Sequence, residues 1–152
     1  MQRPKLKDSL YGEMFWDDWD EEQSYWYAPI AMDSGEKFDL LICADSQADF
    51  LAVAGTRQTY QKLLQNLGSI RDEMMDEIME NSRQLFKKKR QRDSAGEVIK
   101  KNLRLFSIKI FSDLSSEVSF VGKVAEDEDP DETFYALLDE NCEMLEAGIE
   151  EL

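Results

Sequence analysis

The chain has 152 residues, of which 18 are Lys or Arg and 33 are Asp or Glu, so its formal net charge at pH 7 is −15. It contains no histidine, which excludes an imidazole base, a Ser-His-Asp or Cys-His pair and a His-ligated metal. The acidic balance argues against binding to a nucleic-acid backbone, which needs clustered cations, and no apolar run is long enough to span a membrane.

The length and the 42% of hydrophobic residues fit a single domain over residues 1–152. Residues 1–8 are basic but lack the apolar stretch of a signal peptide, so we expect them to form a flexible N-terminus. Cys43 and Cys142 are too few for a disulfide framework, and we expect both to be reduced, inert thiols. Together these features predict a cytoplasmic protein.

Three strands are predicted in the N-terminal part of the chain. Residues 10–16 are rich in aromatic side chains, and residues 24–28 resume the pattern until Pro29, where we expect the strand to end. A polar loop at residues 33–36 leads to a third strand, residues 37–44. Because this third strand is nearly apolar on both faces, we expect it to lie centrally in the sheet.

Two main helices are predicted next. The first follows Thr56, a candidate N-cap, and ends at Gly68. The second begins near Ser69, carries acidic residues in its first turns and buries a stripe that includes Ile70, Met74, Ile78 and Leu85. The basic run at residues 87–92 complements the dipole at its C-terminus. The alternative, a nuclear or nucleic-acid signal, conflicts with the net charge.

After a short helix at residues 98–102, three more strands are predicted at residues 103–111, 118–124 and 133–138. In the first of them, alternation places Leu103, Leu105 and Phe111 on one face and Phe106, Ile108 and Ile110 on the other. Because strands and helices are segregated along the chain, the fold class is predicted as α+β. We expect an antiparallel sheet of about six strands with two main helices packed on one face.

No pattern of residues predicts catalysis, a metal or a cofactor. The glycines are scattered rather than gathered in a phosphate-binding loop, and most carboxylates fall in loops or on helix faces. Ca²⁺ binding by residues 127–132 is an alternative, but the run lacks EF-hand spacing. An unrecognised hydrolase is another alternative, and it requires carboxylates that converge in a pocket.

Two acidic clusters are the candidate partner-binding sites. Of the 33 acidic residues, 12 lie in residues 124–152, where there is no basic residue. Both clusters read as solvated loops, and Trp19, flanked by other aromatic residues, is a candidate hot spot if it is exposed. The first acidic cluster comprises Asp17, Asp18, Trp19, Asp20, Glu21 and Glu22, and the second acidic cluster comprises Asp127, Glu128, Asp129, Asp131 and Glu132.

Several weak motifs, made mainly of aromatic residues and glycines, are distributed along residues 9–150. They are Tyr11-Gly12-Glu13-Met14-Phe15-Trp16, Trp26, Phe38-Asp39-Leu40-Leu41-Ile42, the helical Gln58, Tyr60, Leu63, Leu64 and Asn66, Leu103-Arg104-Leu105-Phe106-Ser107-Ile108, Phe120-Val121-Gly122-Lys123 and Asp139-Glu140-Asn141. In these features the chain resembles small bacterial α+β domains of unknown function found in secretion-system and polymorphic-toxin neighbourhoods. A Gly-His pair often precedes the last strand in those relatives, whereas Glu132-Thr133 stand here.

The resemblance implies an immunity-type role, and the charge points the same way. We expect a non-enzymatic acidic protein that neutralises a basic bacterial toxin by occluding it, with carboxylates paired to Lys and Arg of the toxin. The alternative is a structural or adaptor domain that forms a homodimer through an edge strand. The sequence leaves open whether the protein is a monomer or a homodimer.

Overall fold

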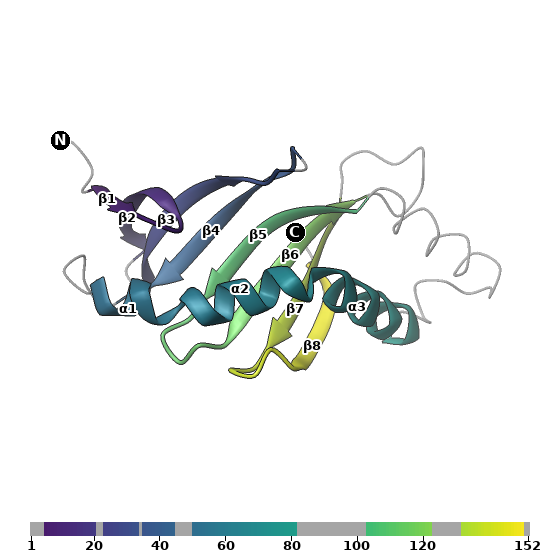
Figure 1. The fold of residues 1–152 in the computed structure, drawn as a ribbon. Helices are drawn as coiled ribbons and strands as arrows, with labels where there is room; N and C mark the ends of the chain where they lie inside the picture. Colours follow the sequence, from purple (N-terminus) through teal and green to yellow (C-terminus); the bar gives the residue numbers. More distant parts are fainter. Residues whose placement is uncertain are drawn as a thin grey trace.

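The structure, a computed structural model, describes residues 5–20, 23–33, 35–44, 50–81, 103–122 and 132–150. Within these ranges the chain forms one eight-stranded sheet and three helices (Figure 1). In chain order the elements are β1 (Lys5–Asp8), β2 (Gly12–Asp20), β3 (Gln23–Ala31), β4 (Lys37–Cys43), α1 (Phe50–Gly55), α2 (Arg57–Gln65), α3 (Leu67–Asn81), β5 (Arg104–Ile110), β6 (Ser116–Gly122), β7 (Glu132–Leu138) and β8 (Met144–Glu150).

The strands lie side by side in the order of the sequence, from β1 at one edge to β8 at the other. Every neighbouring pair is antiparallel except β4 and β5, which run parallel. A parallel pair cannot be joined by a tight turn, and the connection between β4 and β5 contains the three helices. These helices follow one another across one face of the sheet (Figure 1).

The predicted fold class is therefore wrong. The sheet is mixed rather than antiparallel, it has eight strands rather than about six, and the fold is closer to mostly-β than to α+β. The two additional strands are the two edges of the sheet. One is β1, which lies in the segment expected to be flexible, and the other is β8, for which no strand was predicted.

Two predictions within strands fail for local reasons. Strand β3 continues through Pro29 to Ala31, because its pairing with β2 reaches only as far as Tyr27 and Pro29 is paired with β4 alone. In β5, the pairing with β6 skips Phe106, which is the extra residue of a β-bulge. The bulge changes the alternation, so that Leu105 and Ile108 are both buried while Phe106 is 48% exposed.

The helices begin and end at different residues from those predicted. Thr56 stands at the N-cap of α2, but its side chain caps no backbone N–H and is engaged elsewhere. The break between α2 and α3 falls at Asn66 rather than Gly68. The Asn66 amide Nδ2 donates to the Lys62 carbonyl at 2.7 Å, and the Asn66 carbonyl accepts from the Ile70 N–H at 2.8 Å. Asn66 thus ends one helix and starts the next.

The core lies between the helices and the sheet. The predicted stripe on α3 is confirmed for Ile70, Met74 and Ile78, which are all buried, whereas Leu85 lies outside the described residues. The predicted central strand is also confirmed, since β4 lies between β3 and β5 and buries alternate side chains. Trp26 of β3 is 1% exposed and packs edge-on against Trp16 of β2, with ring centroids 5.4 Å apart.

The turn between β1 and β2 is attached to the start of α2 by polar side chains. Asp8 accepts the backbone N–H groups of Leu10 and Tyr11 at 2.8 and 3.0 Å, and its other oxygen pairs with Arg57 at 2.6 Å. The Tyr11 hydroxyl lies 2.8 Å from the Thr56 Oγ1. Because Thr56 donates its one hydroxyl proton to the Val53 carbonyl, Tyr11 is the donor in this bond.

This attachment predicts a loss of stability at alkaline pH. Burial raises the pKa of Tyr11 to about 12, from 10.0 in the unfolded chain. This shift contributes about 2–3 kcal/mol to the free energy of unfolding below pH 10, and the contribution is lost as the pH rises through 12. We expect urea denaturation of Tyr11→Phe to show a shallower decline across this range. If the decline in stability is the same in Tyr11→Phe, it is caused by other tyrosines such as Tyr27 and Tyr60, whose pKa values burial also raises.

Candidate functional site

The outer face of α3 carries a high density of charge. The helix buries Ile70, Met74, Met75 and Ile78 against the core and packs on β8 and β7. Its remaining positions carry five exposed carboxylates and a single cation, Arg71. These carboxylates are Asp72, Glu73, Asp76, Glu77 and Glu80. Side chains of one sign are therefore held on an ordered helix.

Three of these residues, Asp72, Asp76 and Glu80, follow one another at spacings of four residues, and we name them the α3 row. Residues four apart are neighbours on a helix surface, so each like-charged pair destabilises the helix by about 0.2–0.5 kcal/mol. The predicted benefit of acidic residues near a helix N-terminus does not apply, because α3 begins at Leu67 and its first turn contains no acidic residue. Apolar packing holds α3 in place despite this repulsion.

The turn between β7 and β8 and the following strand carry further exposed carboxylates. Asp139 organises this turn by accepting the backbone N–H groups of Asn141 and Glu143, each at 2.9 Å. Lys62 of α2 donates to the Asn141 carbonyl at 2.9 Å and joins the turn to the helices. The exposed carboxylates here are Glu140 and Glu143 in the turn and Glu146 in β8, which pairs with Leu137 and lies on the sheet face away from the helices. Together with those of α3 we call them the acidic surface.

An exposed apolar side chain precedes Glu146 in β8. The pairing of β7 with β8 is irregular between Leu137 and Leu138, because Leu137 pairs with Glu146 and Leu138 with Met144. Leu145 is the extra residue at this bulge, and it is 68% exposed. Leu10 and Phe106 are the other large apolar side chains exposed in the described ranges, at 40% and 48%. Leu145 is thus a single exposed apolar side chain on the edge strand β8.

The structure places the first acidic cluster differently from the prediction. Asp17, Asp18, Trp19 and Asp20 lie in β2 rather than in a loop, with Asp17 paired to Tyr25 and Asp20 to Gln23. Asp17 is half-buried, and Glu21 and Glu22 lie outside the described residues. The loop was predicted from charge alone, but pairing with β3 satisfies the backbone here and keeps this segment extended.

Only one residue of the second acidic cluster lies in the part of the chain that the structure describes. Asp127, Glu128, Asp129 and Asp131 lie outside the described residues, as does the basic run at residues 87–92. Glu132 is the first residue of β7 and pairs with Gly122. The spacing of acidic residues on α3 is visible in the sequence, where it predicts helix stabilisation rather than a binding surface.

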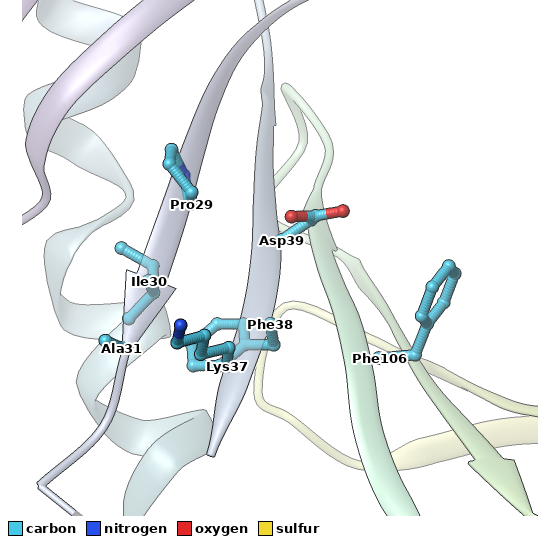
Figure 2. Close-up of a pocket in the computed structure, with 7 residues that line it drawn as sticks. All are labelled: Pro29, Ile30, Ala31, Lys37, Phe38, Asp39 and Phe106. Atoms are coloured by element: carbon cyan, nitrogen blue, oxygen red, sulfur yellow. The ribbon is translucent and has the colours of Figure 1, made fainter. Parts of the chain in front are cut away.

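A shallow hollow lies where β3, β4 and β5 come together (Figure 2). Its volume is about 420 Å³, and it is lined by Pro29, Ile30, Ala31, Lys37, Phe38, Asp39 and Phe106. Asp39 is already engaged, because the Tyr27 hydroxyl donates to it at 3.0 Å. Burial raises the pKa of Tyr27, and the hydrogen bond to Asp39 adds to this effect. Among the lining residues that the structure describes, Lys37 and Asp39 are the charged groups, the other walls are mainly apolar, and no two groups are arranged as nucleophile and base.

Both cysteines are free in the structure. Burial raises the pKa of the Cys43 thiol and of the Cys142 thiol, which lowers the thiolate fraction at neutral pH.

Across the described ranges, no three His, Cys, Asp or Glu side chains are grouped as metal ligands would be. The same ranges contain no helix long and apolar enough to cross a bilayer. The predicted absence of catalysis, metal and cofactor stays a prediction.

Comparison with known proteins gave no match to a protein-family model, to a curated protein or to a solved structure. The resemblance to domains from polymorphic-toxin loci therefore stays a prediction from the sequence.

Proposed function

We propose that this chain is a non-enzymatic binding protein of the bacterial cytoplasm, most concretely an immunity protein that neutralises a basic toxin by occluding it. The observation that carries the proposal is the α3 row, a line of like charges on a helix that is held in place by its buried side. The first and second acidic clusters, which the sequence predicts as contacts, are additional candidates for binding the toxin.

The charge arrangement supports binding because it has a cost in the free protein. Like charges four residues apart repel one another, and cations of a partner placed among them relieve that repulsion. A surface of one sign also accelerates the encounter with an oppositely charged protein. Where a carboxylate pairs with Lys or Arg away from water, removing one partner costs about 2–5 kcal/mol, whereas exposed pairs contribute far less. No catalytic group is needed for this mechanism.

The proposal is tested by co-expressing the chain with the product of the gene beside its own. We expect cells that produce this neighbouring protein to stop growing unless the chain is present. The α3 row variant, Asp72→Asn with Asp76→Asn and Glu80→Gln, should lose most of the protection. The control variant, Glu13→Gln with Asp33→Asn and Glu36→Gln, changes the net charge equally at exposed positions on β2 and the β3–β4 turn. It should protect like the natural chain.

Two results would contradict the proposal. One is a neighbouring protein that is basic and toxic but equally toxic with and without the chain. The other is protection that survives in the α3 row variant, which would remove this surface from the mechanism. Both variants are first compared by circular dichroism, so that loss of protection is not confused with loss of folding.

The alternative function is a structural or adaptor domain that forms a homodimer. The observation that favours it is β8, a seven-residue strand at the edge of the sheet. Small-angle scattering across a range of concentrations separates the two functions. A stable dimer that binds no basic protein supports the adaptor, and a monomer supports the immunity protein.

A further inference from the structure

The two edges of the sheet differ in how well they are protected. Strand β1 has four residues and carries Lys5 and Lys7, two features that discourage pairing with another chain. Strand β8 has seven residues and contains neither lysine nor proline. Within the described residues, β8 pairs with β7 on one side only. Its other side presents backbone N–H and C=O groups to which an extended segment can bond.

The geometry of β8 is suited to accepting such a segment. Past the bulge at Leu145, the pairing with β7 is regular from Glu146 to Glu150, so the strand is uninterrupted there. Gly148 has no side chain, and the Tyr135 ring of β7 lies over it. A Cβ at position 148 would be 2.9 Å from the Tyr135 hydroxyl oxygen. The aromatic ring covers the weak point that a glycine makes in a strand.

The charge around β8 specifies what kind of segment it accepts. Glu143 and Glu146 are exposed on or next to the strand, and α3 packs against β8 with its carboxylates turned to solvent. Leu145 adds an apolar contact at one end. A strand with Lys or Arg at alternate positions and an apolar residue near Leu145 is complementary to this combination.

We infer that β8 accepts an extended, basic segment of the partner protein as a ninth strand. Backbone hydrogen bonds supply affinity, while Leu145 and the acidic surface select the segment. This inference rests on the proposed function, which supplies a basic partner, and adds the way in which that partner is held. A second copy of the chain is a weaker candidate, because its β1 edge is short and two copies with a net charge of −15 repel each other.

The test uses a fluorescent peptide of about eight residues that alternates lysine and valine, because this length matches an ordinary strand. The matched probe is the same peptide with a methyl group on every backbone nitrogen, which keeps the charge and removes the hydrogen-bond donors. We expect the plain peptide to bind and the methylated peptide to bind at least about tenfold more weakly, a difference that fluorescence anisotropy measures. Hydrogen exchange of the β8 amides should slow only with the plain peptide.

Two substitutions of equal charge locate the contact. Leu145→Glu makes the chain more acidic, yet we expect it to weaken binding of the plain peptide several-fold, because an apolar contact is lost. Leu10→Glu changes another exposed leucine, in the turn between β1 and β2, and should leave binding unchanged. Binding driven by charge alone would instead be strengthened by Leu145→Glu.

The outcomes separate this inference from the proposed function. Equal binding of the two peptides, with no protection of β8, overturns strand addition and leaves a charge-driven acidic surface in place. No binding of either peptide counts against both. Concentration-dependent dimerisation that Leu145→Glu abolishes would assign β8 to a second copy and overturn the inference. Tight binding of the plain peptide only, lost in Leu145→Glu alone, supports it.

Discussion

Replacing Trp26 with alanine is expected to lower the free energy of unfolding by about 3–5 kcal/mol, the usual range for removing a large buried ring. Trp26 is 1% exposed, pairs with Ile42 of β4 and packs against the Trp16 ring. Few neighbours can move to fill the space, because the surrounding side chains belong to a continuous sheet. Denaturation by guanidinium chloride, followed by circular dichroism, measures the loss.

Trp26→Phe is the informative comparison. The Trp26 Nε1 is buried and has no hydrogen-bond partner among the described residues. Leaving such a donor without a partner costs about 1–3 kcal/mol, a cost that phenylalanine does not have. We therefore expect Trp26→Phe to be clearly less destabilising than Trp26→Ala. Equal losses for the two variants would mean that neither the retained ring nor the removal of the unpaired donor stabilises Trp26→Phe.

The α3 row variant is expected to be more stable than the natural chain while binding its partner more slowly. Removing these charges removes repulsion within the helix, which should raise the free energy of unfolding by about 0.5–1.5 kcal/mol at low ionic strength. In about 1 M salt the Debye length is only about 3 Å, so the gain should largely disappear. The rate constant for association with a basic partner should fall by about tenfold or more, and its salt dependence should flatten.

The control variant at Glu13, Asp33 and Glu36 separates local repulsion from net charge. It carries the same total charge as the α3 row variant, but its residues are not neighbours on a helix. Equal stabilisation of both variants would show that overall charge, rather than the α3 row, determines the effect. The combination of higher stability and slower binding in the α3 row variant alone would support a surface that is maintained for a partner.

The strands predicted from alternation and aromatic content were all found, but the architecture was not. Strand β8 was missed because Glu143, Glu146 and Gly148 weaken its apolar pattern. It exists through pairing with β7 and packing under α3. The parallel pairing of β4 and β5 has no local signature, since it brings together residues separated by the helical segment. The segregated order of elements therefore predicted an antiparallel sheet.

The candidate site, like the fold, is predicted only in part by the sequence. The acidic residues of α3 are evident in the sequence, but their effect depends on where the helix starts. A start at Ser69 would have placed Asp72 near the positive end of the dipole. The observed start at Leu67 leaves that first turn without acid, so the helix dipole does not offset the repulsion within the α3 row. Likewise, exposure of Leu145 and Phe106 could not be foreseen, because bulges arise from the register of the neighbouring strand.

Composition and short-range periodicity are enough to predict the negative charge, the absence of imidazole chemistry, six of the strands and the buried stripe of α3. The two edge strands, the crossover between β4 and β5 and the exposure of Leu145 become visible only in the folded chain. These features are set by hydrogen bonds and packing between residues far apart in the chain, which no local pattern encodes.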